Sequence, residues 1–270
     1  MKRRTYITFS DGPENDALAE VLHKSISEFS RYGLRIYRRH DFEGDYGIDS
    51  DPDFWRSGRG YVYKALACLK AIEEYDEVVW IDTDCVATTY IDKIWFESWR
   101  ISRYPLLPRS RFYLFGRDIS VNLEIEAPES LDFLRKAREK TGAATTEKRP
   151  FYSQACFMLF KKSCKAFFEE ALSFFDNFEK DCFHNGDETI INCLLWKYGV
   201  EDSLGDIFIC SYFFGYHSNE IASMTCREQF ANFRYRPAQN IFENILFYHG
   251  TKSTEVAESI LSTLKETQGK

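Results

Sequence analysis

The sequence predicts an α/β fold in which a mainly parallel sheet is flanked by helices. Two observations lead to this prediction. Short β-prone runs alternate with amphipathic runs of helical period through the first third of the chain. The chain has 270 residues, 44% of them hydrophobic, so it can bury a substantial core. Strands and helices that alternate at this interval form βαβ units and hence a doubly wound layer.

The first part of the chain supplies the clearest elements. After the first strand, the motif SDGPEND at residues 10–16 has the glycine and proline of a turn that opens a helix. A loop rich in aspartate and glycine, residues 40–54, separates the second strand from the second helix. In order, we expect a strand at 5–10, a helix through Leu18, Val21, Leu22, Ile26 and Phe29, a strand at 34–38, a helix at 61–75 and a strand at 77–81.

The second part of the chain is less regular. Residues 141–150 are the most linker-like segment, but they are too short to mark a domain boundary. We therefore expect one domain over residues 1–252, followed by a C-terminal helix or tail at 253–270. The expected strands are 112–115, 151–160 and 245–248, and the expected helices are 129–140, 163–178, 187–198 and 254–266.

Composition limits the classes of partner and the compartment. The net charge of −7 argues against a broad surface for nucleic acid or for an anionic membrane. The eight cysteines form no C-x-x-C pair and lie mostly in apolar runs, so we read them as buried free thiols in a reducing compartment. No apolar run has the length of a signal peptide core or a membrane span. We expect a cytoplasmic protein whose membrane contact, if any, is peripheral.

Two aspartates follow the most hydrophobic of the predicted strands. Asp82 and Asp84 come directly after the run VVWI, at the carboxyl end of a strand, where parallel α/β sheets bind their ligands. Two carboxylates so placed could converge on one hard cation and leave room for substrate oxygens. The same Asp-Thr-Asp sequence is equally typical of an Asx turn. Spacing alone leaves both interpretations open.

The sequence around these aspartates resembles the GT-A glycosyltransferases, which bind a nucleotide-sugar through a divalent metal. The stretch RGYVYKALACLKAIEEYDEVVWIDTD, residues 59–84, is similar to that family's aromatic-lysine helix and D-x-D strand. The stretch YITFSDGPENDALAEVLHKSI, residues 6–26, resembles its first strand and helix. The resemblance implies a GT-A, Rossmann-like fold with a mixed, mainly parallel sheet. It also implies that Lys64, which lies off its helix's apolar stripe, contacts phosphate or nucleotide instead of solvent.

A third metal ligand could come from the segment LFYHGTKS near the C-terminus. His249 follows a short apolar run, with Gly250 and Lys252 close behind it. A neutral imidazole can complete a metal's shell, and a lysine can neutralise a diphosphate leaving group. The alternative is a surface histidine in a turn. The segment is similar to the H-x-x-G-x-x-K element of family 8 glycosyltransferases, with the spacing shortened to H-G-T-K.

The sequence HNGDETIIN offers acidic groups for the sugar. Glu188 lies three residues after Asn185, which is the spacing of a helix capping box. Asp187 should share the inward face of its helix with Ile190 and Ile191. It is either a first-turn carboxylate favoured by the helix dipole or a site residue. Together with Asn192, the pattern resembles the D-Q-x-x-x-N helix start of many GT-A enzymes.

The strand FYSQACFMLF carries a polar pair that interrupts an apolar run. Ser153 and Gln154 either are satisfied by neighbours in the core or, as the resemblance implies, contact the donor sugar.

The resemblance thus implies a hexosyltransferase that moves a sugar from a nucleotide-diphosphate donor, with UDP-sugars favoured, to a glycan or other hydroxyl acceptor, using Mn²⁺ or Mg²⁺. It assigns Asp187 to catalysis. It assigns the other roles as follows: the metal to Asp82, Asp84 and His249; the nucleotide to Thr8, Ser10, Lys64, Asp82, Thr83 and Lys252; and the sugar to Ser153, Gln154, Asp187 and Glu188.

Three other functions fit parts of the sequence. The motif DTDCV has the form of a haloacid-dehalogenase-like phosphohydrolase motif, in which Asp82 would be the nucleophile and Asp84 the general acid. That class also needs a late pair of acidic residues, for which GDET at residues 186–189 is the one candidate. A nucleotidyltransferase would need a glycine-rich phosphate loop that SDGPEND does not provide. The last alternative is a nucleotide-binding module without transferase activity.

Overall fold

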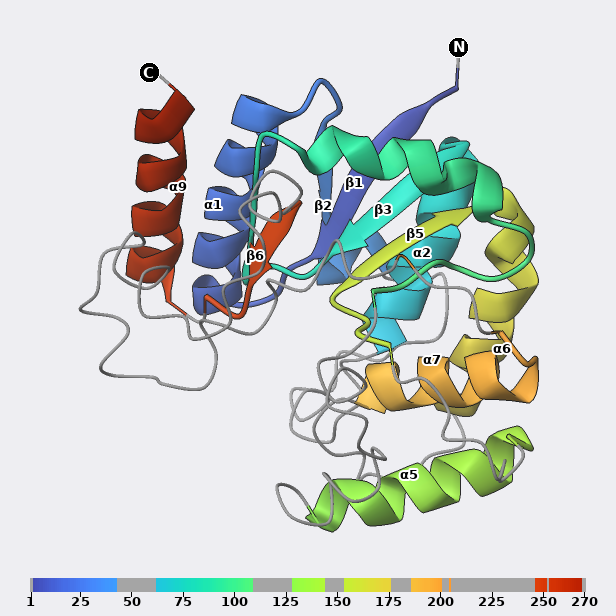
Figure 1. Ribbon diagram of the computed structural model, residues 1–270. Coiled ribbons are helices and arrows are strands. Elements are labelled where there is room, and N and C mark those ends of the chain that lie inside the picture. The colour runs from blue at the N-terminus through green and yellow to red at the C-terminus, as the bar shows by residue number, and fades with distance from the viewer. Residues whose placement is uncertain are drawn as a thin grey trace, which may run out of the picture.

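A computed structural model describes residues 2–42, 62–108, 128–143, 153–175, 186–200, 204, 246–251 and 253–268. Within these ranges the strands form a four-stranded sheet of order β2-β1-β3-β5 and a two-stranded sheet of β4 with β6 (Figure 1). The strands are β1 (Arg4–Phe9), β2 (Leu34–Tyr37), β3 (Glu77–Ile81), β4 (Cys85–Ala87), β5 (Phe157–Lys161) and β6 (Phe247–His249).

The larger sheet is mixed and mainly parallel, as the sequence predicts. Strand β1 pairs in parallel with β2 on one side and with β3 on the other. Strand β5 runs antiparallel to β3, with Val79 opposite Leu159. Because β1, β2 and β3 are parallel, their carboxyl ends lie at one edge of the sheet.

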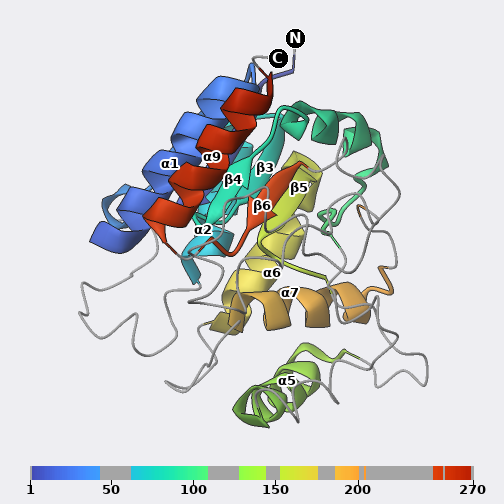
Figure 2. The ribbon, with the colours of Figure 1, turned by 60° about the vertical axis from the view of Figure 1, so that its left-hand side comes forward.

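Helices cover both faces of the larger sheet. Figures 1 and 2 show α1 and α9 side by side on one face, and α2 with α6 on the other. Helix α7 packs against α6 and α5. The helices are α1 (Pro13–Phe29), η1 (Arg39–Phe42), α2 (Val62–Glu74), η3 (Ile91–Arg100), α5 (Pro128–Thr141), η4 (Lys162–Cys164), α6 (Lys165–Phe175), α7 (Gly186–Lys197) and α9 (Thr254–Gln268).

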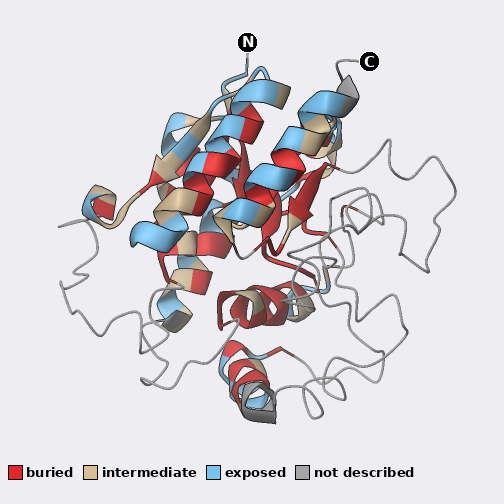
Figure 3. Cartoon of the chain, turned by 90° about the vertical axis from the view of Figure 1, so that its left-hand side faces the viewer, coloured by how far each residue is buried: buried red, intermediate tan, exposed pale blue. Residues whose placement is uncertain are grey.

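Helix α1 begins where local chemistry favours it. Gly12 has a positive φ of 87°, which glycine adopts without strain, and Pro13 follows at the first helical position. Glu14 and Asp16 lie in the first turn, where carboxylates complement the helix dipole. The buried side of the helix faces the sheet, and its exposed side faces solvent (Figure 3).

The core forms around β3, in which every residue is buried. The Val78, Val79 and Ile81 side chains are fully inaccessible to solvent. A strand that is covered by helices on both faces reads as a continuous apolar run, which is why the sequence predicts its bounds correctly.

The smaller sheet ties the C-terminal part of the chain to the middle. Strand β4 pairs antiparallel with β6, so that Cys85 lies opposite His249 and Val86 opposite Tyr248. Val86 and Tyr248 join a small hydrophobic cluster with Ala257 of α9 and Val21 of α1. Helix α9 therefore packs both on α1 and on the smaller sheet.

The structure differs from the sequence prediction at the start of β5. The predicted strand 151–160 is too long, because β5 begins only at Phe157. The backbone N–H of Gln154 donates to Pro108, and the N–H of Ala155 donates to the Glu188 carboxylate, so neither joins a ladder. The sequence also gave no indication of β4 or η3. The predicted strand at 112–115 lies outside the described residues.

In the part of the chain that the structure describes, every helix is too short or too polar to cross a membrane.

A buried serine joins α1 to β4 and yields a test of this packing. The Ser25 hydroxyl donates to the Leu22 carbonyl at 2.8 Å and accepts the Ala87 N–H at 3.0 Å. Ser25→Ala should leave that buried N–H without its partner and lower the free energy of unfolding by about 1–3 kcal/mol. Ser27→Ala, on the exposed side of the same helix, is the control. Equal stability of the two variants in urea unfolding would contradict this account.

Candidate functional site

The chain turns sharply after β3. The Asp82 N–H donates to the Cys156 carbonyl at 2.9 Å, which continues the pairing with the β5 side for one residue. The Cys85 N–H then donates to the Asp82 carbonyl at 3.2 Å and closes a turn into β4. This turn is closed by a bond between backbone atoms, whereas the Asx turn that the sequence left as an alternative would be closed by an aspartate side chain. It places Asp82, Thr83 and Asp84 at the carboxyl edge of the parallel strands, half-buried.

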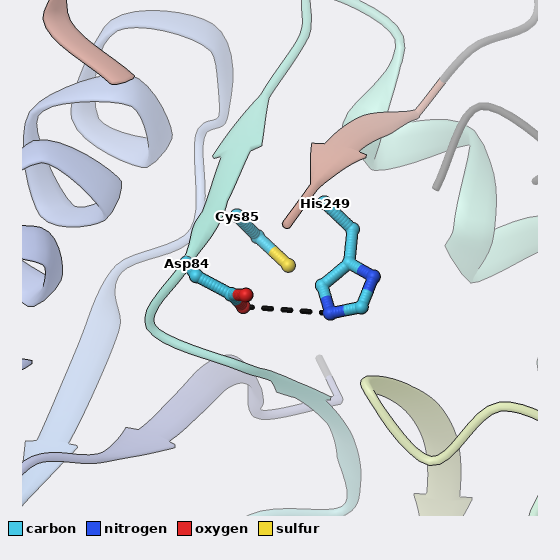
Figure 4. A group of neighbouring side chains, drawn as sticks. All are labelled: Asp84, Cys85 and His249. Carbon is cyan, nitrogen blue, oxygen red and sulfur yellow. Dashed lines mark ion pairs between the residues drawn. The ribbon is translucent and has the colours of Figure 1, made fainter. Parts of the chain in front are cut away.

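His249 lies beside Asp84. The Nε2 atom of His249 is 3.5 Å from Oδ1 of Asp84. Figure 4 shows the Asp84, Cys85 and His249 side chains pointing toward one another from the end of β6 and the start of β4. Their donor atoms all lie within 4.8 Å of one another. The Asp84 carbonyl accepts the N–H groups of Gly250 and Thr251 at 3.0 and 3.1 Å, which fixes the segment after β6 to the D-x-D turn.

The donor set suits a hard or borderline divalent cation. A carboxylate oxygen and an imidazole nitrogen bind Mn²⁺ or Mg²⁺, and two protein donors leave positions for substrate oxygens. Burial raises the pKa of the Cys85 thiol well above its ordinary value. The Asp82 carboxylate is not part of this group.

Asp82 faces a buried lysine instead. Its Oδ1 accepts the indole N–H of Trp80 at 2.6 Å and lies 3.1 Å from Nζ of Lys64. Lys64 also forms an ion pair with Asp187 and donates to the Ala155 carbonyl at 3.0 Å. Burial disfavours the charged ammonium, but the carboxylates of Asp187 and Asp82 outweigh burial and raise the pKa of Lys64. Lys64 is therefore not the exposed lysine that its place on α2 alone suggested.

Helix α7 brings its first turn to this lysine. Asp187 is buried, as its spacing from Ile190 and Ile191 predicted. Its neighbour Glu188 accepts the Ala155 N–H at 2.9 Å. Burial raises the pKa of Glu188 to about 7, although the bond from Ala155 lowers it in part. The predicted capping partner, Asn185, lies outside the described residues.

Asn192 holds the polar pair that precedes β5. Its side chain accepts the Ser153 N–H at 2.7 Å and donates to the Ser153 carbonyl at 2.8 Å. Ser153 and Gln154 are both buried. The amide thus fixes the backbone next to Ala155, which contacts both Lys64 and Glu188.

The remaining predicted residues lie near the end of β1 or outside the described part. Thr8 is fully buried, and its hydroxyl has no hydrogen-bond partner among the described residues. The buried Ser10 hydroxyl donates to Asp16 at 2.6 Å. Lys252 lies outside the described residues.

Two contributors to the site carried no clear signal in the sequence. Trp80 belongs to the apolar run before the D-x-D motif, and Cys85 is one of several cysteines in apolar runs. The motif that includes Asn192 pointed to the start of α7, but not to the bonds of Asn192 with Ser153. Trp80 and Cys85 flank the D-x-D motif, so position next to the motif was the available signal.

Comparisons with known proteins bear on the fold. No protein-family model matches the chain, and no curated protein sequence matches it. The structure of mouse xyloside xylosyltransferase 1, apo form, is similar with a TM-score of 0.50 and 11% identity, over 92% of this chain and 97% of that one. The chain has a glycosyltransferase fold. A glycosyltransferase involved in the glycosylation of the major capsid of PBCV-1 also matches, with a TM-score of 0.45 and 9% identity, over 98% of this chain and 99% of that one.

The Lys64 cluster makes a prediction about stability. Lys64→Met should leave the Asp82 and Asp187 carboxylates close together without their cation, and should lower the free energy of unfolding by about 3–5 kcal/mol. Asp187→Asn should cost less, because Lys64 keeps Asp82. Urea unfolding measures both, and Lys165→Met on the exposed side of α6 is the control. The opposite order of the two site variants would contradict the bridging role of Lys64.

Glu188 makes a prediction about pH. Its pKa is about 7 in the folded protein against an ordinary value of 4.5, so its ionisation destabilises the fold. This penalty grows between those two pH values and is complete above the higher one. Glu188→Gln cannot ionise and should therefore become more stable than the original protein by on the order of 2 kcal/mol as pH rises from about 5 to about 8.

The measurement is thermal unfolding of both proteins across that pH range. Glu169→Gln, on the exposed side of α6, controls for the loss of a surface charge. A stability difference between Glu188→Gln and the original protein that does not change with pH would show that Glu188 has the same pKa in the folded and unfolded states.

Proposed function

We propose that the protein is a metal-dependent glycosyltransferase that moves a hexosyl group from a nucleotide-diphosphate sugar, with UDP-sugars favoured, to a hydroxyl of a glycan or another acceptor. The observation that carries this proposal is the meeting of Asp84 with His249 at the carboxyl edge of the sheet, next to the ion pair of Lys64 with Asp187. The fold shared with xyloside xylosyltransferase 1 supports it.

Asp84 and His249 would hold Mn²⁺ or Mg²⁺, and Asp82 would assist them or hold the ribose. When bound, the ion supplies positive charge that stabilises the diphosphate leaving group. Because Lys64 and Trp80 already engage the Asp82 carboxylate, we assign direct ligation to Asp84 first.

The nucleotide would lie along the carboxyl edge of the parallel strands. Thr8 is near the end of β1 and Ser10 follows that strand, and Thr83 lies in the turn after β3. The bonds from Gly250 and Thr251 to the Asp84 carbonyl hold the segment that leads into Lys252. Lys252 would neutralise the diphosphate, because a lysine ammonium is a compact positive charge.

The sugar would face the first turn of α7. Asp187 is our choice for the residue near the anomeric carbon, with Lys64 holding its carboxylate in place. Glu188, Ser153 and Gln154 would contact the sugar hydroxyls. Carboxylates and amides are the groups that usually fix sugar hydroxyls by hydrogen bonds.

The test is hydrolysis of a panel of UDP-, GDP- and other nucleotide-sugars with and without Mn²⁺, since slow hydrolysis requires no knowledge of the acceptor. We expect release of the nucleoside diphosphate from one donor class, dependent on the metal. Asp84→Asn and His249→Ala should each lower that rate by roughly a hundredfold or more and should remove the Mn²⁺-dependent shift in unfolding temperature.

Asp76→Asn and His23→Ala are matched controls, because both residues are exposed. Asp76 precedes β3, at the end of that strand away from the D-x-D turn, and His23 lies on α1, far along the chain from β6. If the original protein hydrolysed nucleotide-sugars equally fast with and without Mn²⁺, and Mn²⁺ did not shift its unfolding temperature, the proposal would be wrong. Release of inorganic phosphate from phosphate monoesters, with nucleotide-sugars left intact, would instead support the phosphohydrolase interpretation with Asp82 as nucleophile.

A further inference from the structure

Two large aromatic side chains are exposed at the end of the sheet opposite to the candidate site. Phe96 and Trp99 lie on η3 and are 76% and 79% exposed. Helix η3, in green at the top of Figure 1, crosses the sheet near the N-terminus, where β1 and β3 begin. The candidate site lies at the other end of β3, so neither aromatic residue belongs to it.

Phe96 and Trp99 are exposed although the helix that carries them, η3, is packed firmly against the rest of the protein. Ile91, Ile94 and Trp95 are buried beneath η3, and the Trp95 ring packs against Tyr6 with centroids 5.2 Å apart. In a 3₁₀-helix, side chains three residues apart lie on the same face. Phe96 and Trp99 therefore form one outward apolar feature on a fixed support.

Basic residues converge beside this feature. The Glu77 carboxylate, which is buried, accepts from Lys2 and Arg4 at 2.6 Å each and lies 3.8 Å from Lys161. Burial disfavours the charged carboxylate, but the bonds from Lys2 and Arg4 outweigh burial and lower its pKa. The Ser98 hydroxyl, next to Trp99, also bonds to Glu77. One carboxylate with three cations leaves this cluster positive.

The surplus of positive charge extends over the described residues at this end. The basic residues there outnumber the acidic ones, although the whole chain carries a charge of −7. We call Phe96, Trp99 and the basic residues around them the amino-end patch. Its basic residues are Lys2, Arg3, Arg4, Arg31, Lys93, Arg100, Arg103 and Lys161, and the acidic residues near them are Glu73, Glu74, Asp76, Glu77, Asp92 and Glu97.

We propose that the amino-end patch docks the protein on an anionic lipid surface. Aromatic rings next to lysines and arginines are the combination that binds lipid headgroups and the upper acyl region. Phe96 and Trp99 project from a helix at the outer edge of the molecule, so a flat surface can take them without a complementary pocket. The net charge of −7 argues against a broad basic face. It is compatible with this patch, because the patch covers only one end of the molecule. The docking does not depend on the proposed transferase function.

Docking at this end would leave the carboxyl edge of the sheet facing away from the lipid. Because β3 runs from Glu77 at the patch to Ile81, which directly precedes Asp82 of the site, the two features lie at opposite ends of one strand. A water-soluble substrate would then reach the site freely while the protein is held at the surface.

The test is co-sedimentation of the whole chain with vesicles of phosphatidylcholine alone and with vesicles of an equal mixture of phosphatidylcholine and phosphatidylserine. We expect binding to the mixed vesicles only, weakened by added salt. The double variant Phe96→Ser, Trp99→Ser should lower partitioning by about tenfold or more. The double variant Lys93→Gln, Arg103→Gln should lower it by about fivefold for each charge removed.

Matched controls lie elsewhere on the surface. Tyr198→Ser removes an aromatic residue that is 41% exposed directly after α7, and Lys24→Gln removes an exposed charge on α1. Both should bind vesicles as the original protein does. Thermal unfolding checks that each variant is folded, and the charge variant tests the proposal independently if the aromatic variant does not fold.

Equal binding to both kinds of vesicle, or none to either, would overturn the proposal. A concentration-dependent dimer in sedimentation velocity that the aromatic double variant abolishes, without vesicle binding, would assign the patch to a second copy of the chain. Both outcomes leave the metal-dependent hydrolysis assay unaffected.

Discussion

The arrangement of the candidate site depends on the buried ammonium of Lys64. Four carboxyl groups gather where β3 ends and α7 begins: Asp82, Asp84, Asp187 and Glu188. Like charges so close together repel strongly in a partly buried setting. Lys64 neutralises Asp82 and Asp187 directly. Burial and the nearby Asp187 charge favour the neutral form of Glu188 near pH 7. Only Asp84 is left to meet a group from outside this cluster.

The group that Asp84 meets comes from the far end of the sequence. Pairing of β4 with β6 sets Cys85 opposite His249, and the N–H groups of Gly250 and Thr251 close on the Asp84 carbonyl. These bonds are between backbone atoms, so they hold the histidine near the aspartate whatever else occupies the site. The geometry is thus prepared by secondary structure and does not require the side chains to find each other.

Sequence reasoning succeeded where a local pattern determined the structure. Strand β3 was predicted with its correct bounds because a run such as VVWI is stable only when it is buried on both faces. The inward position of Asp187 followed from helical period. The meeting of His249 with Asp84 was only a hypothesis, because it depends on the pairing of two three-residue strands. Strands so short carry no periodicity that a sequence could reveal.

Long-range polar contacts explain the other differences. The start of β5 was predicted as strand, but its backbone groups bond to Asn192, Glu188 and Pro108. Lys64 was expected in solvent or on phosphate because no local pattern shows that two distant carboxylates will bury it. These contacts join residues 18 to 123 positions apart along the chain. Breaking one of them would lower the free energy of unfolding considerably, because a buried polar group would lose its partner.

The two ends of β3 show how one buried strand separates two kinds of charge. At its start, Glu77 is surrounded by Lys2, Arg4 and Lys161, so cations are in excess. At its end, Asp82 lies in a cluster where carboxyl groups are in excess and a metal cation would restore balance. An apolar strand of five residues holds these clusters apart by about 16 Å. At that separation water and salt screen one from the other, so each end can bind its own partner independently.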